Sequence, residues 1–200
     1  MFVHVVDDDE AVRESLGDLL RSMGYRTTLH ASATGFLDAE LPDTPACLLL
    51  DVRLPDANGL EVQEYLKQAD VRLPVILMTG FGDIAMSVRG MKAGAVDFLT
   101  KPVRHQDLLD AVVVATQLDQ CRRQEAGQIS ALRQRYETLT PRERQVVALI
   151  ASGLTNKGVA RKLSISEVTV KMHRGSAGKK LEARSVAALV RMTEALGILG

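Results

Sequence analysis

Acidic, hydroxyl and amine side chains stand at the ends of short apolar runs in the first half of the chain. Asp7 and Asp8 end one run, Asp51 ends another, Thr79 ends a third, and Lys101 closely follows a fourth. Carboxylate oxygens are the ligands that a hard divalent cation prefers, and a carboxylate can also accept a phosphoryl group. Gathered in one pocket, these side chains predict a site that binds Mg²⁺ and is phosphorylated on an aspartate.

Such a pocket requires a fold in which the apolar runs end at one edge. Five β-rich runs alternate with five helical patterns, and some of the runs are continuously apolar, as strands buried on both faces are. The alternation predicts an α/β doubly wound parallel five-stranded sheet, which binds ligands where its strands end. We expect strands at 2–7, 25–29, 46–50, 74–78 and 96–99, and helices at 10–23, 32–39, 58–68, 83–93 and 105–118.

Each of these residues also has an ordinary structural explanation when it is considered alone. An Asp after a strand is most often a turn residue or a helix cap, which is how we interpret Asp9. Thr79 alone fits a strand-end hydroxyl, and Lys101 alone fits a solvated amine. The group is harder to explain in this way, because Asp7 and Asp8 would repel Asp51 unless a cation lay between them.

Charge divides the chain into two halves, although the formal net charge is zero. Residues 1–118 carry 10 Lys and Arg against 18 Asp and Glu, whereas residues 140–200 carry 11 against 4. An acidic half and a basic half favour two domains with different partners. We therefore expect a first domain at 1–118, a helical linker at 119–139 and a second domain at 140–200.

The linker and the second domain are both expected to be helical. Apolar residues follow four- and three-residue steps through 119–139, but polar residues and Gly127 interrupt them. This pattern favours a helical linker with room for a hinge near 122–127 over a continuous coiled coil. The second domain is expected to be small and all-α, with a tight turn at 163–165 that is typical of a helix-turn-helix. Its helices are expected at 141–153, 156–162, 167–181 and 185–196.

Residues 1–118 resemble the receiver domain of two-component response regulators, in which VVDD, LLLD, MTG and FLTKP occur in this order and spacing. The resemblance implies that Asp51 is the phosphoacceptor. It also implies that Asp7, Asp8, Asp51 and the backbone carbonyl of Arg53 hold Mg²⁺. Phosphoryl transfer depends mainly on positioning and charge neutralisation, which such a set supplies.

The same resemblance assigns roles to three residues beside the carboxylates. Thr79 and Lys101 would bind the phosphoryl group, and Phe98 would be a switch aromatic that changes position on activation. The family also implies a cis peptide bond at Lys101-Pro102. Lys101 suits its role because its ammonium is a compact charge that can pair with a phosphoryl oxygen. From composition alone, Phe98 is a core aromatic of a strand.

Residues 140–200 resemble a LuxR-type helix-turn-helix, through LTPRERQVVALIASGLTNKGVARKL and SISEVTVKMHR. With the receiver, and with the segments MKAGAVDFLTKP and PDANGLE, the chain resembles the FixJ/NarL family of regulators and its FixJ-like branch. The resemblance implies that Lys171, Met172 and Gly175 face base edges. Ser166 is expected to cap the recognition helix. Contacts to phosphates, which position without specifying, are expected from Lys157, Ser164, Thr169, Arg174 and Lys179.

A solvated basic face is the ordinary alternative for these lysines and arginines, and two glycines depart from the family pattern. Gly158 stands where a Glu commonly completes a capping box with Thr155, and Gly178 replaces a larger apolar residue. A glycine inside a helix costs about 1 kcal/mol relative to Ala. We therefore expect a loosely packed third helix and weak DNA binding by the isolated chain.

Together these features predict a phosphorylation-dependent transcriptional regulator of a two-component system, whose partner is a sensor histidine kinase. Phosphorylation is expected to produce a homodimer through the fourth helix and fifth strand, near Asp83 to Leu99, that binds double-stranded promoter DNA. RNA polymerase is a further expected partner. No enzymatic activity is expected beyond the receiver's own phosphorylation and dephosphorylation. Because the chain has neither a signal sequence nor an apolar run of spanning length, we expect it in the cytoplasm, without a membrane partner.

Two other classes of protein share part of this pattern. An Asp-nucleophile phosphatase of the haloacid dehalogenase type needs a second acid two residues after its nucleophile, where this chain has Arg53. A receiver that serves as a phosphate sink or a protein-binding module has no need of a basic domain. Gly178 keeps that last alternative open.

Overall fold

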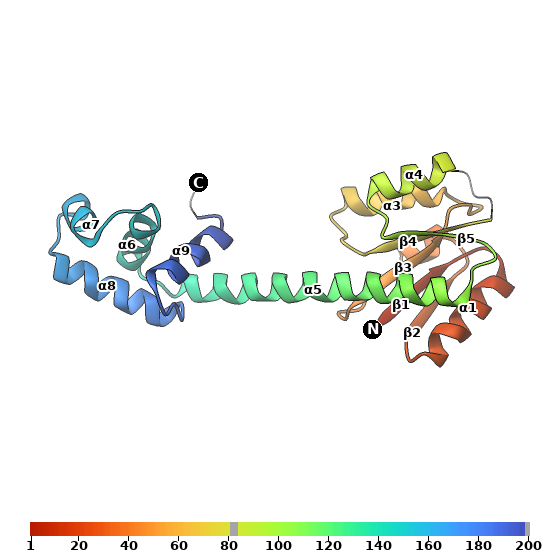
Figure 1. Cartoon of the computed structure of the whole chain (residues 1–200), viewed down its shortest axis with the longest axis horizontal. Helices are drawn as coiled ribbons and strands as arrows, with labels where there is room; N and C mark the ends of the chain where they lie inside the picture. The colour runs from red at the N-terminus through yellow and green to blue at the C-terminus, as the bar shows by residue number, and fades with distance from the viewer. Residues whose placement is uncertain (81–83, 199–200) are drawn as a thin grey trace. The chain divides into compact units, whose positions relative to one another are not determined.

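The chain divides into two compact units, Met1–Arg123 and Gln124–Gly200, in a computed structural model that describes residues 1–80 and 84–198 (Figure 1). The first unit is a sheet flanked by helices, and the second is helical throughout its described part. The fold class expected from the sequence, a five-stranded parallel α/β domain followed by an all-α domain, is confirmed.

The sheet of the first unit has five parallel strands in the order β2-β1-β3-β4-β5. Strand order reverses between β1 and β3, and ligands of such sheets bind at the carboxyl ends of the strands beside this switch point. Every strand lies within one residue of its expected bounds: β1 Phe2–Val6, β2 Arg26–His30, β3 Ala46–Asp51, β4 Val75–Thr79 and β5 Asp97–Thr100.

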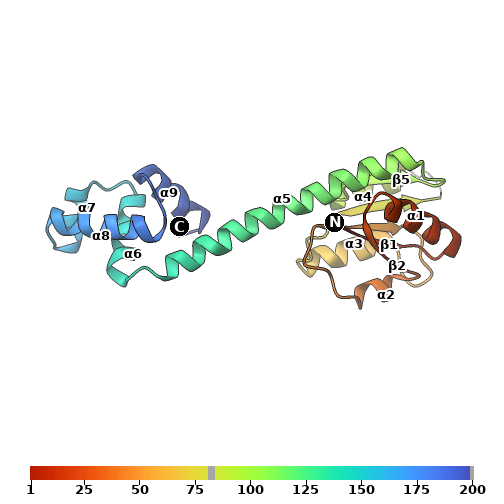
Figure 2. The same ribbon diagram turned by 90° about the horizontal axis from the view of Figure 1, so that it is seen from below.

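Helices cover both faces of this sheet: Figure 1 shows helices on either side of the strands, and Figure 2 shows the same ribbon turned by 90°. Alternate residues of each strand point to opposite faces, so each strand contributes to two cores. Leu48 and Leu50 of β3 pack towards α2 (Ala33–Leu37) and α3 (Gly59–Gln68), whereas Cys47 and Leu49 pack towards α1 (Glu10–Ser22) and α5 (His105–Glu137). Burial on both faces explains why these strands are continuously apolar. The helices before α5 are α1 Glu10–Ser22, α2 Ala33–Leu37, α3 Gly59–Gln68 and α4 Ile84–Ala93. Residue 83, where the sequence placed the start of the fourth helix, lies outside the described residues.

A pair of buried histidines lies between β1, β2 and α2. His4 Nδ1 is 3.2 Å from His30 Nε2, and His30 Nδ1 donates to the carbonyl oxygen of Gly35 at 3.1 Å. The rings of Phe2 and Phe36 contact this pair. Burial, together with His30, lowers the pKa of His4 to about 4, and burial also lowers the pKa of His30. Both rings are therefore neutral at pH 7.

Helix α5 runs from His105 to Glu137 without a break, so no interruption marks the hinge that the sequence allowed near 122–127. Its first part packs on the sheet, and Leu132 and Tyr136 near its end pack on the core of the second unit. The fully buried Asp119 accepts a hydrogen bond from the backbone N–H of Ala46 at 3.0 Å and also pairs with two arginines, Arg122 and Arg123. The segment 119–139 therefore contributes residues to both units.

After α5, the described part of the second unit contains four short helices, α6 Pro141–Ala151, α7 Asn156–Leu163, α8 Glu167–Lys180 and α9 Val186–Ala195. Thr140 and Glu143 form the expected capping box at the start of α6. Ser164 adopts a left-handed conformation (φ 54°) in the tight turn between α7 and α8, and the N–H of Ile165 closes that turn by donating to Ala160. These features confirm the helix-turn-helix arrangement of α7 and α8.

The two unusual glycines have different surroundings. Thr155 caps α7 by accepting from the N–H of Gly158 at 3.2 Å, which is half of a capping box, as expected for this sequence. Gly178 borders a cleft of about 260 Å³ that is also lined by Ile150, Val186 and Leu189. A larger side chain at 178 would therefore enter a cleft with both apolar and polar lining, beside the carbonyl oxygen of Ala183.

Candidate functional site

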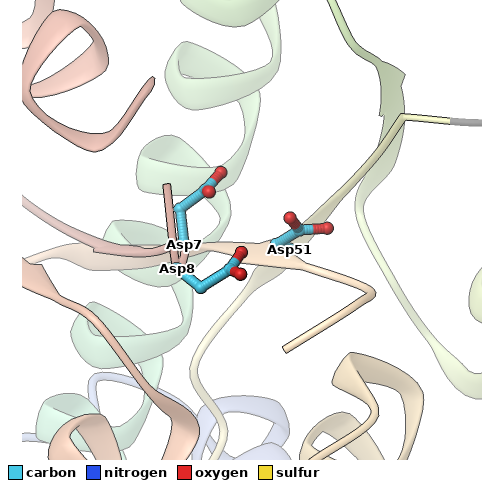
Figure 3. A group of neighbouring side chains, drawn as sticks. All are labelled: Asp7, Asp8 and Asp51. Atoms are coloured by element: carbon cyan, nitrogen blue, oxygen red, sulfur yellow. The ribbon is translucent and has the colours of Figure 1, made fainter. Parts of the chain in front are cut away.

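Three carboxylates meet at the carboxyl edge of the sheet, beside the switch point. Asp7 and Asp8 directly follow β1, and Asp51 is the last residue of β3. Oxygen atoms of the three side chains all lie within 4.8 Å of one another, and Figure 3 shows them side by side. Asp7 and Asp51 are buried, whereas Asp8 is exposed. Like charges this close repel, and an all-oxygen donor set suits Mg²⁺, so these residues fit that cation.

The amine of Lys101 lies against two of these carboxylates. Its Nζ is 2.5 Å from Asp51 Oδ2 and 2.6 Å from Asp7 Oδ2. Burial opposes the charge of Lys101, but hydrogen bonds from its amine to Asp51 and Asp7 outweigh burial and raise its pKa. Burial raises the pKa of Asp7, and Lys101 counteracts that effect only in part. Lys101 therefore stays charged and can compensate negative charge brought to the site.

Thr79 and Lys101 come from neighbouring strands. Thr79, the buried last residue of β4, pairs with Thr100 of β5, and its carbonyl oxygen accepts from the N–H of Lys101 at 2.7 Å. The Lys101-Pro102 peptide bond is cis, as the resemblance implied. Phe98 is partly buried against the core on the α3 side of the sheet, apart from the carboxylates. Thr79 thus lies at the same edge of the sheet as Lys101, whereas Phe98 packs against the core on the α3 side.

The loop after β3 is packed tightly against Asp51. The backbone N–H of Arg53 donates to Asp51 Oδ1 at 3.1 Å. Gly59, the first residue of α3, approaches so closely that a Cβ there would lie 2.5 Å from the carbonyl oxygen of Asp51 and 2.9 Å from Val52 Cα. Only glycine fits at this position without moving the backbone of Asp51. This glycine stands within PDANGLE, but the pattern of that segment predicted no role for it.

Arg13 is a second residue that the sequence analysis missed. Its Nη1 donates to the carbonyl oxygen of Asp7 at 2.7 Å and to that of Asp8 at 3.3 Å. Asp9 caps α1 as expected, and its own N–H donates to Asp7 Oδ1 at 3.1 Å. Arg13 lies one helical turn after Asp9, and that spacing was the available signal. Together Arg13 and Asp9 hold in place the loop after β1 that carries Asp7 and Asp8.

Helix α8 presents an exposed stripe in the second unit. Ser166 caps the helix by accepting from the N–H of Thr169 at 3.1 Å, as expected. The opposite side of α8 is buried through Val170 and Ala177. Positions spaced by three or four residues share one face of a helix. The exposed stripe consists of Val168, Lys171, Met172, Gly175 and Lys179. Val168, which was not among the predicted DNA contacts, is 75% exposed.

The other residues expected to contact DNA differ in their surroundings. Lys157 and Ser164 are exposed at the start of α7 and in the turn after it. The hydroxyl of Thr169 is 2.8 Å from that of Ser166. Arg174 donates to Asn156 Oδ1 at 3.1 Å, so this side chain ties α8 to the start of α7.

Glu143 braces α8 against α6, a role that the capping-box pattern did not reveal. Its carboxylate accepts from Ser176 Oγ at 2.6 Å, from Lys180 Nζ at 2.7 Å and from the N–H of Thr140 at 2.8 Å. Burial would raise the pKa of Glu143, but these donors outweigh burial and hold it at about 2. The recognition helix is therefore fixed by a carboxylate that remains charged.

Comparison with known proteins agrees with this geometry. Residues 3–113 match the response regulator receiver domain, and residues 137–193 match the bacterial regulatory proteins of the luxR family. Nodulation protein W of Bradyrhizobium diazoefficiens is 50% identical over 196 residues, which are 98% of this chain and 86% of that protein. The structure of response regulator StyR is 46% identical, with a TM-score of 0.84 over 96% of this chain and 98% of StyR. Full-length FixJ from B. japonicum is 36% identical, with a TM-score of 0.59 over 100% and 98% of the two chains.

The fold, the acidic site and these matches define a class, the two-component response regulators that join a receiver domain to a LuxR-type DNA-binding domain. The chain belongs to this family and is similar to its FixJ-like members. It is therefore a phosphorylation-dependent, DNA-binding transcriptional regulator. Among the residues described, no helix combines the length and the apolarity needed to cross a membrane.

Proposed function

We propose that Asp51 is the phosphoacceptor of this regulator and that a sensor histidine kinase supplies its phosphoryl group. The observation that carries the proposal is the convergence of Asp7, Asp8 and Asp51 within 4.8 Å, with the amine of Lys101 2.5 Å from Asp51. Of the three acids, Asp51 ends the strand, and one of its oxygens is held by the N–H of Arg53. This arrangement supports attack by the other oxygen on a phosphorus atom.

Asp7, Asp8 and Asp51, with the backbone carbonyl of Arg53, would hold Mg²⁺. When bound, the cation supplies charge neutralisation to the phosphoryl oxygens and the carboxylates. A carboxylate oxygen of Asp51 then forms the bond to phosphorus as the bond to the donor breaks, which leaves an acyl phosphate. Lys101 exchanges a carboxylate contact for a phosphoryl oxygen, and the hydroxyl of Thr79 donates to another. Phe98 then changes its packing beneath the site.

Phosphorylation would act on DNA through a homodimer. We assign 1–118 to the receiver, 119–139 to a helical linker and 140–200 to the DNA-binding domain. The proposed dimer surface is α4 with β5, where Val88 and Met91 are 45% and 46% exposed. Asp83, at the edge of that expected surface, lies outside the described residues. A two-headed binder gains affinity for a two-fold related site because the second contact is intramolecular.

Helix α8 would enter the major groove of promoter DNA. Lys171, Met172 and Gly175 would face base edges, and the exposed stripe on α8 supports this assignment. Phosphate contacts would come from Lys157, Ser164, Thr169, Arg174 and Lys179, with Ser166 ordering the start of the helix. RNA polymerase is a further proposed partner. We place the protein in the cytoplasm, with its promoter DNA, and assign it no enzymatic activity beyond its own phosphorylation and dephosphorylation.

The phosphoacceptor is tested by incubating the full chain with a small-molecule phosphodonor and Mg²⁺ and locating the acyl phosphate by mass spectrometry. Asp51→Asn should lose the label. Asp18→Asn is a matched control, because Asp18 is a surface acid of the same unit with a side chain 78% exposed. Undiminished labelling of Asp51→Asn would show that another residue accepts the phosphoryl group.

A further inference from the structure

Helix α8 exposes two large apolar side chains one turn apart. Val168 and Met172 are 75% and 63% exposed, the highest values among the large hydrophobic residues that the structure describes. Both lie outside the core clusters of their unit, whereas Val170, on the other side of the helix, is fully buried. Apolar surface gains stability when it leaves water, so a neighbouring pair of this kind is expected to be covered by a partner.

The surroundings of the pair indicate the chemistry of that partner. Lys171 lies between the two in the sequence, and Lys179 lies further along the same exposed stripe. Gly175 comes next along the stripe, and nothing beyond the adjoining stretch of its own helix lies within 4 Å of the place where its Cβ would stand, so a partner can approach the helix backbone there. The partner must therefore have a surface that is bordered by negative charge and carries small apolar groups inside that border. The major groove of DNA has both, because phosphates border it and thymine methyl groups project from its floor.

We propose that Val168 determines sequence specificity and that Val168 and Met172 together bind the methyl groups of two thymines. This inference rests on the proposed DNA-binding role of α8. Valine has no hydrogen-bonding group, so Val168 can distinguish bases only by shape and apolar contact. The methyl group is the apolar feature that separates thymine from the other bases in the major groove.

The helix also sets the spacing of the two thymines. Four residues span about 6 Å along a helix axis, and successive bases are about 3.4 Å apart along DNA. The two methyl groups should therefore lie one or two base-pair steps apart, on either strand. A lysine between them, Lys171, remains available to a neighbouring guanine.

The experiment uses the full chain, phosphorylated with a small-molecule phosphodonor and Mg²⁺, to select binding sites from a pool of random DNA. Each thymine of the selected site is then replaced in turn by uracil, which removes the methyl group and keeps the hydrogen-bonding edge. The wild-type chain should lose about fourfold in affinity at each of two thymines, the effect of one buried methyl group. Val168→Ala should abolish this penalty at one thymine, and Met172→Ala should abolish it at the other.

Two further variants keep the result interpretable. Val186→Ala makes the same change at another exposed valine of the unit, 45% exposed on α9, and should keep both uracil penalties. Val168→Thr keeps the shape of the side chain and should weaken the penalty less than Val168→Ala does.

Contrary outcomes separate the inference from the function on which it rests. If Val168→Ala retains every uracil penalty of the wild type, or loses affinity equally for selected and scrambled DNA, Val168 does not read sequence and the inference is wrong. The exposed pair would then belong to a contact with another protein. If the wild-type chain selects no sequence at all, the proposed DNA-binding role of α8 fails together with the inference.

Discussion

Both units of the chain bury carboxylates, but they surround them differently. At the ends of β1 and β3, three acids lie together, and two of them, Asp7 and Asp51, share the amine of Lys101. In the second unit, Glu143 alone receives an amine, a hydroxyl and a backbone N–H. The acids of this cluster are short of positive charge and hydrogen-bond donors, whereas Glu143 is fully supplied. Carboxylates that lack donors and positive charge can still bind a cation and a phosphoryl group. A carboxylate whose oxygens are all hydrogen-bonded, such as that of Glu143, instead holds two helices together.

The pKa values reflect this difference. Burial raises the pKa of Asp7, and the opposing effect of Lys101 is too small to cancel that rise. Burial acts in the same direction on Glu143, yet its donors bring that pKa to about 2. Whether a buried acid serves chemistry or architecture therefore depends on the number of donors that reach it.

The largest effect, on the rate of phosphorylation, is expected from a substitution that shifts the acid-rich cluster of Asp7, Asp8 and Asp51. In Gly59→Ala, the new Cβ would stand 2.5 Å from the carbonyl oxygen of Asp51, so the backbone of Asp51 must shift. We expect the rate of phosphorylation by a small phosphodonor to fall roughly 100-fold, since displacements of about 1 Å have effects of that size. Gly127→Ala is the control, because its Cβ meets no atom within 4 Å. Equal rates for both variants would contradict the tight fit at Gly59.

Removing the carboxylate of Glu143 should lower the stability of the second unit substantially. In Glu143→Ala, Ser176 and Lys180 lose their shared acceptor, and α8 loses its tie to α6. We expect the free energy of unfolding to fall by about 2–3 kcal/mol. The measurement is urea denaturation of the full chain followed through NMR signals of the second unit. Glu194→Ala, at an exposed acid of α9, should change little.

Acid should destabilise the two units in separate pH ranges. The pKa of His4 is lowered in the folded state, so its contribution is complete above pH 6.5 and is lost as the pH falls towards about 4. Glu143 contributes above its unfolded value of 4.5 and loses its effect as the pH falls towards about 2. The first unit should therefore weaken first.

NMR signals from each unit, followed during acid titration, check this order. His4→Phe removes the buried titrating group and keeps an aromatic ring beside Phe2 and Phe36. The acid transition of the first unit should move to lower pH in this variant, while that of the second unit stays in place. Simultaneous loss of both units in the wild type would contradict the separation.

A smaller effect, a gain in stability, is expected from replacing a glycine of α8, the helix that Glu143 ties to α6. Gly178→Ala removes a helix-interior glycine, and its Cβ would lie 3.4 Å from the carbonyl oxygen of Ala183, a tolerable contact. The second unit should gain about 1 kcal/mol in thermal or urea unfolding. A loss of stability would show that the neighbouring cleft does not accommodate a side chain.

The smallest stability effect, with the opposite sign to that at Glu143, is expected at Asp8. Asp8→Asn relieves repulsion in the acid-rich cluster, so without Mg²⁺ the first unit should gain about 0.5 kcal/mol, a small value because Asp8 is exposed. Titration with Mg²⁺ should show most of the binding lost. Destabilisation by Asp8→Asn would mean that the carboxylate of Asp8 makes stabilising contacts, as that of Glu143 does. The contrast in donor supply between the three-acid cluster and Glu143 would then be wrong.

Much of the fold could be predicted from local pattern. All five strands lie within one residue of their expected bounds, because parallel strands covered on both faces must be continuously apolar. The caps at Asp9, Thr140 and Ser166 were also predictable, since a cap bonds the backbone two or three residues onward. Convergence of Asp7, Asp8 and Asp51 followed from the rule that parallel strands end at one edge.

Burial of particular residues was decided by contacts between distant segments. Val168 and Val170 look equivalent in the sequence, yet one is 75% exposed and the other is fully buried, because only one face of α8 meets α6 and α7. Asp119 is buried where it accepts from the N–H of Ala46, 73 residues away. Glu143 becomes a brace through partners 33 and 37 residues further on. Periodicity and capping depend on neighbours in the chain, so the sequence alone determined the elements and their acidic ends. Exposure and hydrogen-bond supply depend on which elements pack together, and only the tertiary structure decided them.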